Sequence, residues 1–228
     1  MTRLNLIILV IFFSLIYIFL IPDEPFLLKI TFKIIPMILM ILFVFLKRNS
    51  NNPAFSKWLL FGLIFCMLGD ATLHWFLLGL SCFLVGHICY IVAFFKVKKK
   101  AINVYIAIFL LAYGLMMVAW IAGNLFKSGN YILSVAVCFY IAVILTMGWS
   151  AIQSYSPLLI IGALSFIFSD SILAINKFIT DIPMSHVLIM TSYYGAQLLF
   201  TLSLLNYSVV RKKVLELWQC FKYKEDSN

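Results

Sequence analysis

The sequence predicts an all-α protein, a polytopic membrane bundle of eight transmembrane helices, and three observations carry this prediction. Hydrophobic residues make up 64% of the 228 residues and charged residues only 11%, whereas soluble domains contain about 45–50% apolar and about 25% charged residues. Apolar runs of about 20 residues, the length that a bilayer requires, follow one another with short gaps. Prolines fall at the ends of these runs, where they cost a helix least. This composition excludes soluble enzymes and nucleic-acid-binding proteins, so no nucleic acid is expected as a partner.

The predicted spans are bounded by polar residues and prolines. The first span follows Arg3 but has no small-residue cleavage site of the kind that ends a signal peptide, so we expect it to be retained. Five prolines lie at predicted ends: Pro22, Pro25, Pro53, Pro157 and Pro183. In chain order the spans are 4–21, 26–46, 58–75, 77–95, 102–122, 131–150, 157–178 and 184–208. No room remains for an extramembrane domain, and residues 1–228 are predicted to form a single transmembrane domain.

The distribution of Lys and Arg predicts the orientation, because short cytoplasmic loops carry an excess of these residues. With a cytoplasmic N-terminus, one side of the membrane carries Arg3, Lys47, Arg48, Lys57, Lys96, Lys98, Lys99, Lys100, Arg211, Lys212, Lys213, Lys222 and Lys224. The other side carries Lys29, Lys127 and Lys177, and Lys33 lies inside a span. Both termini are therefore predicted to be cytoplasmic, with a basic tail at 211–228. The protein is expected in the inner membrane if its source is bacterial.

Two segments of the chain resemble each other at a constant offset. FGLIFCMLGDATL in the third span and IGALSFIFSDSIL in the seventh align Gly62, Asp70 and Leu73 with Gly162, Asp170 and Leu173. Because an even number of spans separates the copies, both run in the same direction. We therefore predict two parallel four-helix repeats, with halves of about 1–100 and 101–210.

Five ionisable residues are candidates for the interior of the bilayer: Lys33, Asp70, His74, His87 and Asp170. Each charge at the centre of a bilayer costs about 2.5–3.5 kcal/mol on insertion scales, so a compensating role is expected. In the eighth span, Tyr194 and Gln197 share one helical face. Lipid cannot satisfy polar faces on several helices, which predicts a shared interior cavity.

The alternative to a functional role for Lys33 is a purely structural one, an ion pair that only joins two helices. Lys33 neutralises one aspartate but not both, and two carboxyls in one cavity favour retention of a proton by one of them. His74 lies at a helix end beside Trp75, an ordinary interfacial position. The cysteines are scattered and the histidines unclustered, so we expect no metal site and no cofactor.

The motifs around these residues resemble those of the lysoplasmalogenase (YhhN-like) family of eight-span membrane proteins. The longest resembling run is GDATLHWFLLGLSCFLVGHICYIVAF, from Gly69 to Phe94. Further matches are KIIPM at 33–37, Tyr140 and Met147, GALSFIFSDS at 162–171, and YYGAQLLFTLS at 193–203. The resemblance covers roughly residues 29–205. Ile34 stands where the family often has proline, and His74 is not part of the family pattern.

The resemblance implies hydrolysis of the vinyl-ether bond of lysoplasmalogens to a fatty aldehyde and glycerophosphoethanolamine or glycerophosphocholine. Asp70 and Asp170 are the expected catalytic residues. The expected substrate-binding residues are Lys33, His87, Tyr140, Tyr194 and Gln197. A lysophospholipid substrate and membrane lipid are the expected partners, and the sequence leaves open whether the chain forms a homodimer. Acid–base catalysis by two carboxyls suits this chemistry, since a vinyl ether is hydrolysed through protonation of carbon.

Two other functions agree with parts of the sequence. A small proton- or cation-coupled membrane transporter would also use a carboxylate pair between paired four-helix units. No span, however, shows the paired Gly and Pro interruptions of broken transporter helices. A membrane scaffold, whose polar layer only fixes how the helices pack, is the third alternative.

Overall fold

The computed structural model describes residues 2–22, 24–47, 52–99 and 104–225, with side chains up to residue 205. Within these ranges every regular element is helical. The α-helices are α1 (Arg3–Phe19), α2 (Phe26–Leu46), α3 (Pro53–Thr72), α4 (Phe76–Phe95), α5 (Val104–Met117), α6 (Gly123–Lys127), α7 (Tyr131–Gln153), α8 (Pro157–Phe178) and α9 (Ser185–Glu225). A π-helical segment, η1 (Val118–Ala122), joins α5 to α6. The all-α prediction is confirmed.

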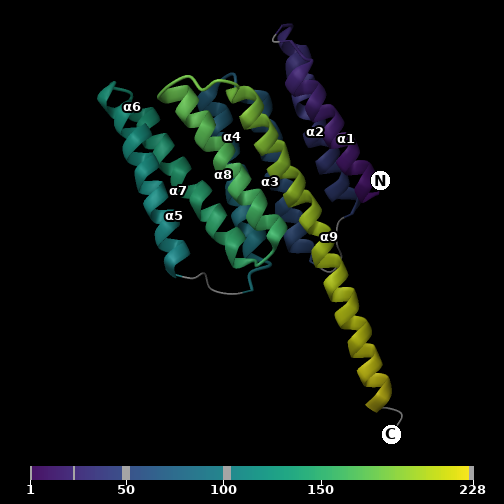
Figure 1. Ribbon diagram of the computed structural model, residues 1–228. Helices are drawn as coiled ribbons and strands as arrows, with labels where there is room; N and C mark the ends of the chain where they lie inside the picture. The colour runs from purple at the N-terminus through teal and green to yellow at the C-terminus, as the bar shows by residue number, and fades with distance from the viewer. Residues whose placement is uncertain (1, 23, 48–51, 100–103, 226–228) are drawn as a thin grey trace.

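Seven helical segments are long and apolar enough to cross a membrane within the described residues. One of them is the continuous run of α5, η1 and α6 over Val104–Lys127, and the last is the Ser185–Leu205 part of α9. The helix α1, with 17 residues, is shorter but also apolar. The segments stand side by side as a bundle, and α9 continues beyond it toward the C-terminus (Figure 1). The expected count of eight spans is consistent with this arrangement.

Three predicted spans differ from the observed helices by more than three residues at one end, and one of them is the eighth, expected at 184–208, whose helix continues to Glu225. The third, expected at 58–75, begins at Pro53, because Asn52 caps the helix: the Phe55 backbone N–H donates to Asn52 Oδ1 at 3.1 Å. The fifth, expected at 102–122, continues to Lys127 through the π-helical segment. Hydropathy follows apolar residues only, so it misses helical turns that polar caps stabilise at the membrane surface. The predicted basic tail at 211–228 lies outside the residues whose side chains the structure describes.

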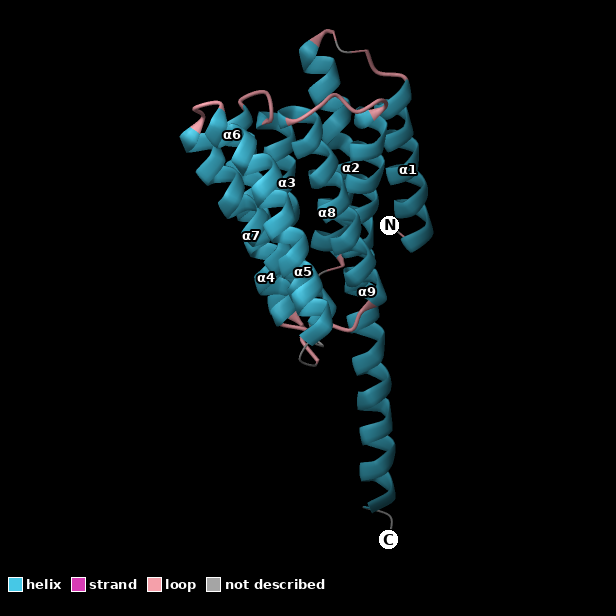
Figure 2. Ribbon diagram, turned by 60° about the vertical axis from the view of Figure 1, so that its left-hand side comes forward, coloured by secondary structure: helices cyan, strands magenta, loops and turns pink. Residues whose placement is uncertain are grey.

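Two helix pairs form the centre of the bundle, α3 with α4 and α8 with α9. The helix α7 packs on α4 and α8, α5 lies on α7 at one edge, and α1 and α2 lie at the opposite edge (Figures 1 and 2). In the α3–α4 pair the ring of Tyr90 lies against Gly62, and in the α8–α9 pair the ring of Phe200 lies against Gly162. The two glycines are those that the internal comparison aligns. The division into two repeats nevertheless stays a prediction.

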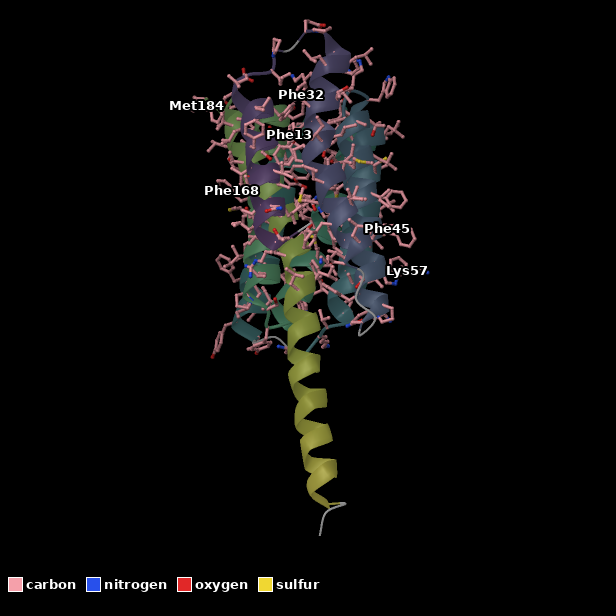
Figure 3. All side chains as sticks on the ribbon, turned by 90° about the vertical axis from the view of Figure 1, so that its right-hand side faces the viewer. Phe13, Phe32, Phe45, Lys57, Phe168 and Met184 are labelled. Atoms are coloured by element: carbon pink, nitrogen blue, oxygen red, sulfur yellow. The ribbon has the colours of Figure 1, made fainter. Side chains whose placement is uncertain are left out.

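The outer surface of the bundle is apolar, as a lipid-facing surface must be. Large side chains point outward around the helices (Figure 3), including Phe45 on α2, which is 57% exposed, and Phe168 on α8, which is 52% exposed. Polar groups are instead buried: Lys33, Asp70, His87 and Gln197 are all at most 9% exposed. The polar layer expected from the sequence therefore lies in the interior.

Candidate functional site

Asp70, near the C-terminal end of α3, is held by side chains from two other helices. Lys33 Nζ on α2 lies 3.2 Å from Asp70 Oδ1 and donates to the Asp70 backbone carbonyl at 3.4 Å. The hydroxyl of Tyr193 on α9 donates to Asp70 Oδ2 at 2.6 Å. This buried carboxylate thus has a compensating cation and a hydroxyl donor, which offset much of its desolvation cost.

Lys33 is itself fixed by α9. The Tyr194 hydroxyl donates to the Lys33 backbone carbonyl at 2.7 Å. Because Tyr193 and Tyr194 are consecutive, one turn of α9 holds both partners of the ion pair, the aspartate through its side chain and the lysine through its backbone. The arrangement joins α2, α3 and α9 at a single point of the bundle.

A cavity of about 490 Å³ opens next to this ion pair. It is lined by Lys33 and Asp70, by two further charged residues, Glu24 and Lys29, and by two histidines, His74 and His186. Glu24 and His186 lie at the starts of α2 and α9, and His74 follows the end of α3, so the cavity reaches the end of the bundle where these helix ends meet. The cavity is large and polar enough to hold water or a hydrated headgroup.

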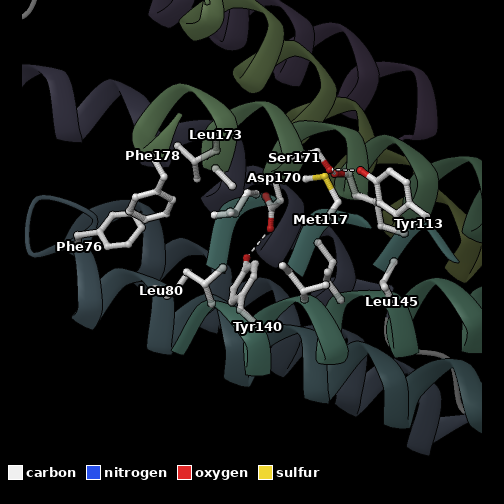
Figure 4. A pocket seen from close by; sticks show the side chains of 16 residues that line it. Phe76, Leu80, Tyr113, Met117, Tyr140, Leu145, Asp170, Ser171, Leu173 and Phe178 are labelled. Atoms are coloured by element: carbon white, nitrogen blue, oxygen red, sulfur yellow. Dashed lines mark hydrogen bonds between the residues drawn. The ribbon is translucent and has the colours of Figure 1, made fainter. Parts of the chain in front are cut away.

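Asp170 on α8 has a different environment. The Tyr140 hydroxyl on α7 donates to Asp170 Oδ2 (Figure 4). In the described part of the chain, the structure records no ion pair for Asp170. The aspartate lines a narrow slot of about 50 Å³, whose other walls are mainly apolar side chains of α4, α5, α7 and α8.

A second hydrogen bond, between two hydroxyls, lies in the wall of this slot. Tyr113 Oη on α5 and Ser171 Oγ on α8 lie 2.6 Å apart (Figure 4). Ser171 donates its own hydroxyl proton to the Ile167 backbone carbonyl at 2.6 Å, so Tyr113 is the donor in the pair. The bond ties the edge helix α5 to the helix that carries Asp170.

A row of aromatic rings connects the two aspartates. Tyr140, which holds Asp170, contacts His87 with ring centroids 5.3 Å apart, and His87 contacts Phe166 at 4.7 Å. Phe166 in turn contacts Tyr193, which holds Asp70, at 5.4 Å. Each contact is edge-to-face, the favourable geometry for such rings. Leu173 on α8 lines both the cavity beside Asp70 and the slot beside Asp170.

The structure separates the predicted site residues into two groups. Lys33, Asp70, Tyr140 and Asp170 line the two cavities. His87, Tyr194 and Gln197 line neither cavity. His87 is fully buried, and both of its ring nitrogens lack a hydrogen-bond partner. The Tyr194 hydroxyl donates to the Lys33 backbone carbonyl, and Gln197 Oε1 accepts from the Tyr90 hydroxyl at 2.5 Å. Substrate contact by these three residues stays a prediction.

Three residues that shape the site were not predicted from the sequence: Tyr113, Ser171 and Tyr193. Tyr193 lies in the quoted YYGAQLLFTLS segment, beside the residue that was singled out, and its position relative to Asp70 depends on how α9 packs. Ser171 follows Asp170 directly and was a detectable signal. Tyr113 lies in a uniformly apolar run and gave none.

Among the described residues, no group of three or more His, Cys, Asp and Glu side chains is arranged to hold a metal ion. His74 packs between Phe26 and Trp75, with ring centroids at 5.1 Å and 5.9 Å. The carboxyls, the ammonium and the hydroxyls at the two cavities can supply proton transfer and charge stabilisation.

The profile of the YhhN family matches residues 28–204. Lysoplasmalogenase TMEM86B of Rattus norvegicus is 30% identical over 208 residues, covering 85% of this chain and 80% of the relative. Lysoplasmalogenase TMEM86A of Bos taurus is 32% identical over 157 residues, covering 62% of each chain. A lysoplasmalogenase of Mycobacterium bovis is 28% identical over 159 residues, covering 64% of this chain and 59% of the relative. The last two matches therefore span about three fifths of each relative's length. No solved structure gives a significant match.

Proposed function

Since this chain belongs to the YhhN family, we propose that it hydrolyses the vinyl-ether bond of lysoplasmalogens to a fatty aldehyde and glycerophosphoethanolamine or glycerophosphocholine. The relatives named lysoplasmalogenase support the substrate class. The observation that carries the mechanism is the contrast between two aspartates of the interior: Asp70 is buried and paired with a lysine, whereas Asp170 is partly buried and has no recorded cation.

Asp170 is the general acid in this proposal. A carboxyl that lines an apolar slot without a compensating charge is most stable in its neutral form, and a neutral carboxylic acid is what protonation of an alkene carbon requires. The Tyr140 hydroxyl holds one oxygen of the carboxyl and leaves the other free to carry the proton. His87 packs on the Tyr140 ring and is assigned a positioning role.

Asp70 is the carboxylate that stabilises the cation and activates water. Lys33 and Tyr193 keep it ionised and oriented. The adjoining cavity of about 490 Å³ supplies the space for water. The vinyl ether is placed beside Leu173, the residue that lines both cavities.

The reaction then proceeds in two balanced stages. Asp170 gives its proton to the alkene carbon remote from the ether oxygen, which leaves an oxocarbenium ion. Water adds to the carbon next to oxygen while Asp70 takes one water proton, giving a hemiacetal. In the second stage Asp170 removes the hemiacetal hydroxyl proton and Asp70 returns a proton to the ether oxygen. The carbon–oxygen bond breaks, an aldehyde and an alcohol leave, and both aspartates regain their first states.

The substrate headgroup is assigned to the cavity beside Asp70. A phosphate carries negative charge, and the cavity is lined by the two lysines Lys29 and Lys33 and by two histidines. Glu24 lies in the same lining and suits the ammonium of ethanolamine or choline. Lys33 therefore forms the ion pair with Asp70 and also lines the cavity that would bind the phosphate.

The test is aldehyde release by the purified protein in liposomes that contain an alkenyl lysolipid, with the acyl lysolipid of the same headgroup assayed in parallel. Aldehyde from the alkenyl lipid alone supports the proposal. Release of a fatty acid from the acyl lipid would make the protein a lysophospholipase. Loss of a pH gradient across the liposomes, without either product, would favour the transporter.

Substitution of each aspartate tests the assigned roles. Asp70→Asn and Asp170→Asn are each expected to lower aldehyde release by about 10²-fold or more, the scale of one acid–base group. Both variants keep the size of the side chain, so size-exclusion chromatography should show a folded protein. Full activity in the double variant would end the two-carboxylate mechanism.

A further inference from the structure

Two hollows follow one another along the seam between α5 and α7. The first is the narrow slot at Asp170, lined on α5 by Tyr113 and Met117. The second, of about 400 Å³, is lined by side chains nearer the start of α5 and the end of α7, including Leu110 and Trp149. Leu145 lines both. The two hollows are thus consecutive parts of one seam, and Asp170 lines the first of them.

The seam is long and apolar. On α5 it extends from Ala107 to Met117 and on into η1 at Ile121, which is about 21 Å at the rise of an α-helix. The one hydroxyl-bearing residue that lines the second hollow, Thr146, donates to the Ala142 backbone carbonyl at 2.7 Å and is satisfied within its own helix. The seam therefore offers an apolar ligand little competition from polar groups.

Leu145 and Gly114 form the constriction between the hollows. A side chain at position 114 would collide with Cδ1 of Leu145, so the absence of a Cβ is what lets Leu145 lie against α5. The Val104–Lys127 span, which begins with α5, is also the least buried of the seven long spans, with 22% of its most apolar stretch inside the protein. An edge helix with so few internal contacts can yield to a ligand at small cost.

We propose that this seam binds the alkenyl chain of the lysolipid and that Leu145, seated on Gly114, sets the preferred chain length. The inference rests on the proposed function and adds the position of the hydrocarbon chain. In a vinyl ether, the carbon that receives the proton is the one from which the rest of the chain continues. The acid must therefore lie where the chain begins, and Asp170 lines the first hollow of the seam, from which the second hollow continues past Leu145.

The positions of the two reacting carbons also separate the two ends of the substrate. The carbon attacked by water carries the ether oxygen and lies toward the headgroup, which matches Asp70 and the charged cavity beside it. The headgroup and the chain then leave the reacting bond on opposite sides of Leu173. Membrane lipid chains that cover the outside of the seam without preference are the competing occupant.

Substitution of Leu145 tests the constriction. In Leu145→Trp the indole ring, which is larger than the leucine side chain, should block the seam. We expect kcat/KM for a hexadecenyl lysolipid to fall about tenfold or more relative to kcat/KM for an octenyl lysolipid. Leu145→Ala should shift the ratio toward the longer chain. Leu115→Trp is the matched control, because Leu115 is on the same α5 helix but 62% exposed and lines neither hollow. An unchanged ratio in both folded Leu145 variants would overturn the proposal.

A binding readout separates this inference from the proposed activity. The probe is a hexadecyl lysophospholipid, a saturated ether that the mechanism cannot cleave, with a diazirine at the chain end. We expect photolabelling of α5 and α7 around Leu111, Thr146 and Trp149, competed by the unlabelled ether. Labelling spread over all lipid-facing helices, or without competition, would assign the seam to bulk lipid. If the wild-type protein releases no aldehyde but the label is competed at the seam, the proposed function fails and the chain site stands.

Discussion

The ion pair between Lys33 and Asp70 lies in the interior, where its two partners depend on each other. The side chain of Asp70 is 2% exposed and that of Lys33 is 11% exposed. Removal of one partner from a buried pair leaves an uncompensated charge, whereas removal of both leaves none. The pair therefore contributes to structure as well as to the proposed chemistry, and the two contributions can be separated.

Lys33→Met should destabilise the protein by about 3–5 kcal/mol, the usual cost of one unpaired buried charge. Asp70→Asn in the same chain removes that charge, so the double variant should regain most of the lost thermal stability in detergent. Neither variant should release aldehyde at the wild-type rate. Equal unfolding temperatures for the single and the double variant would show that the pair carries no structural energy.

At the scale of the helices, two close approaches determine how the central pairs pack. Gly62 faces the ring of Tyr90, and Gly162 faces the ring of Phe200 with its Cε1 atom 2.7 Å from where a Cβ would lie. Tyr90 is further held by its bond to Gln197, which connects the α3–α4 pair to α9. Small residues let helices approach closely in membranes, where packing replaces the hydrophobic effect.

Gly62→Ala and Gly162→Ala are each expected to lower stability by about 1–3 kcal/mol, because the added methyl group displaces a fully buried ring. Gly195→Ala on α9 is the control, since a Cβ at that position would meet nothing within 4 Å. Thermal unfolding followed by size-exclusion chromatography measures the difference. A Gly62 variant as stable as the Gly195 variant would contradict the packing argument.

The spans were predictable because a bilayer imposes one strong requirement, and about 20 apolar residues satisfy it. The start of α3 and the continuation of the helix beyond α5 could not be predicted in this way, since the cap at Asn52 and the π-helical turn are local backbone features. Asp70, Asp170 and Lys33 were identified by the cost of charge in lipid. Tyr193, the partner of Asp70, and Tyr113, the partner of Ser171, were not identified, because hydroxyl pairing depends on how helices rotate against each other, which hydropathy does not record.

For the whole molecule, the two cavities lie toward one end of the bundle. The residues that mark this end are Glu24 and His74 for the larger cavity and Phe76 and Phe178 for the slot, all at or next to helix ends on that side. The charge asymmetry of the loops predicts that this end faces away from the cytoplasm. Substrate would then enter from the outer leaflet.

Single cysteines in a cysteine-free background test this orientation. A cysteine at Leu78, which is 50% exposed near the start of α4, should react with a membrane-impermeant thiol reagent added outside cells. A cysteine at the exposed Lys99, beyond the opposite end of α4, should react only after the cells are opened. The reverse pattern would invert the topology and place the site in the inner leaflet.

The unequal surroundings of the two aspartates also make them unequal targets for chemical modification. Asp70 borders a polar cavity and has the Lys33 amine 3.2 Å away, so a water-soluble carbodiimide should convert this ion pair into an amide that joins α2 to α3 covalently. Asp170 borders an apolar slot and lacks such an amine among its recorded partners, so a lipid-soluble carbodiimide should instead leave a stable adduct on it. Peptide mass spectrometry distinguishes the two products. A lysine–aspartate crosslink found at Asp170, or an adduct confined to Asp70, would contradict the assignment. Carbodiimides should thus inactivate the protein through two different covalent products, and the solubility of the reagent in water or in lipid determines which product forms.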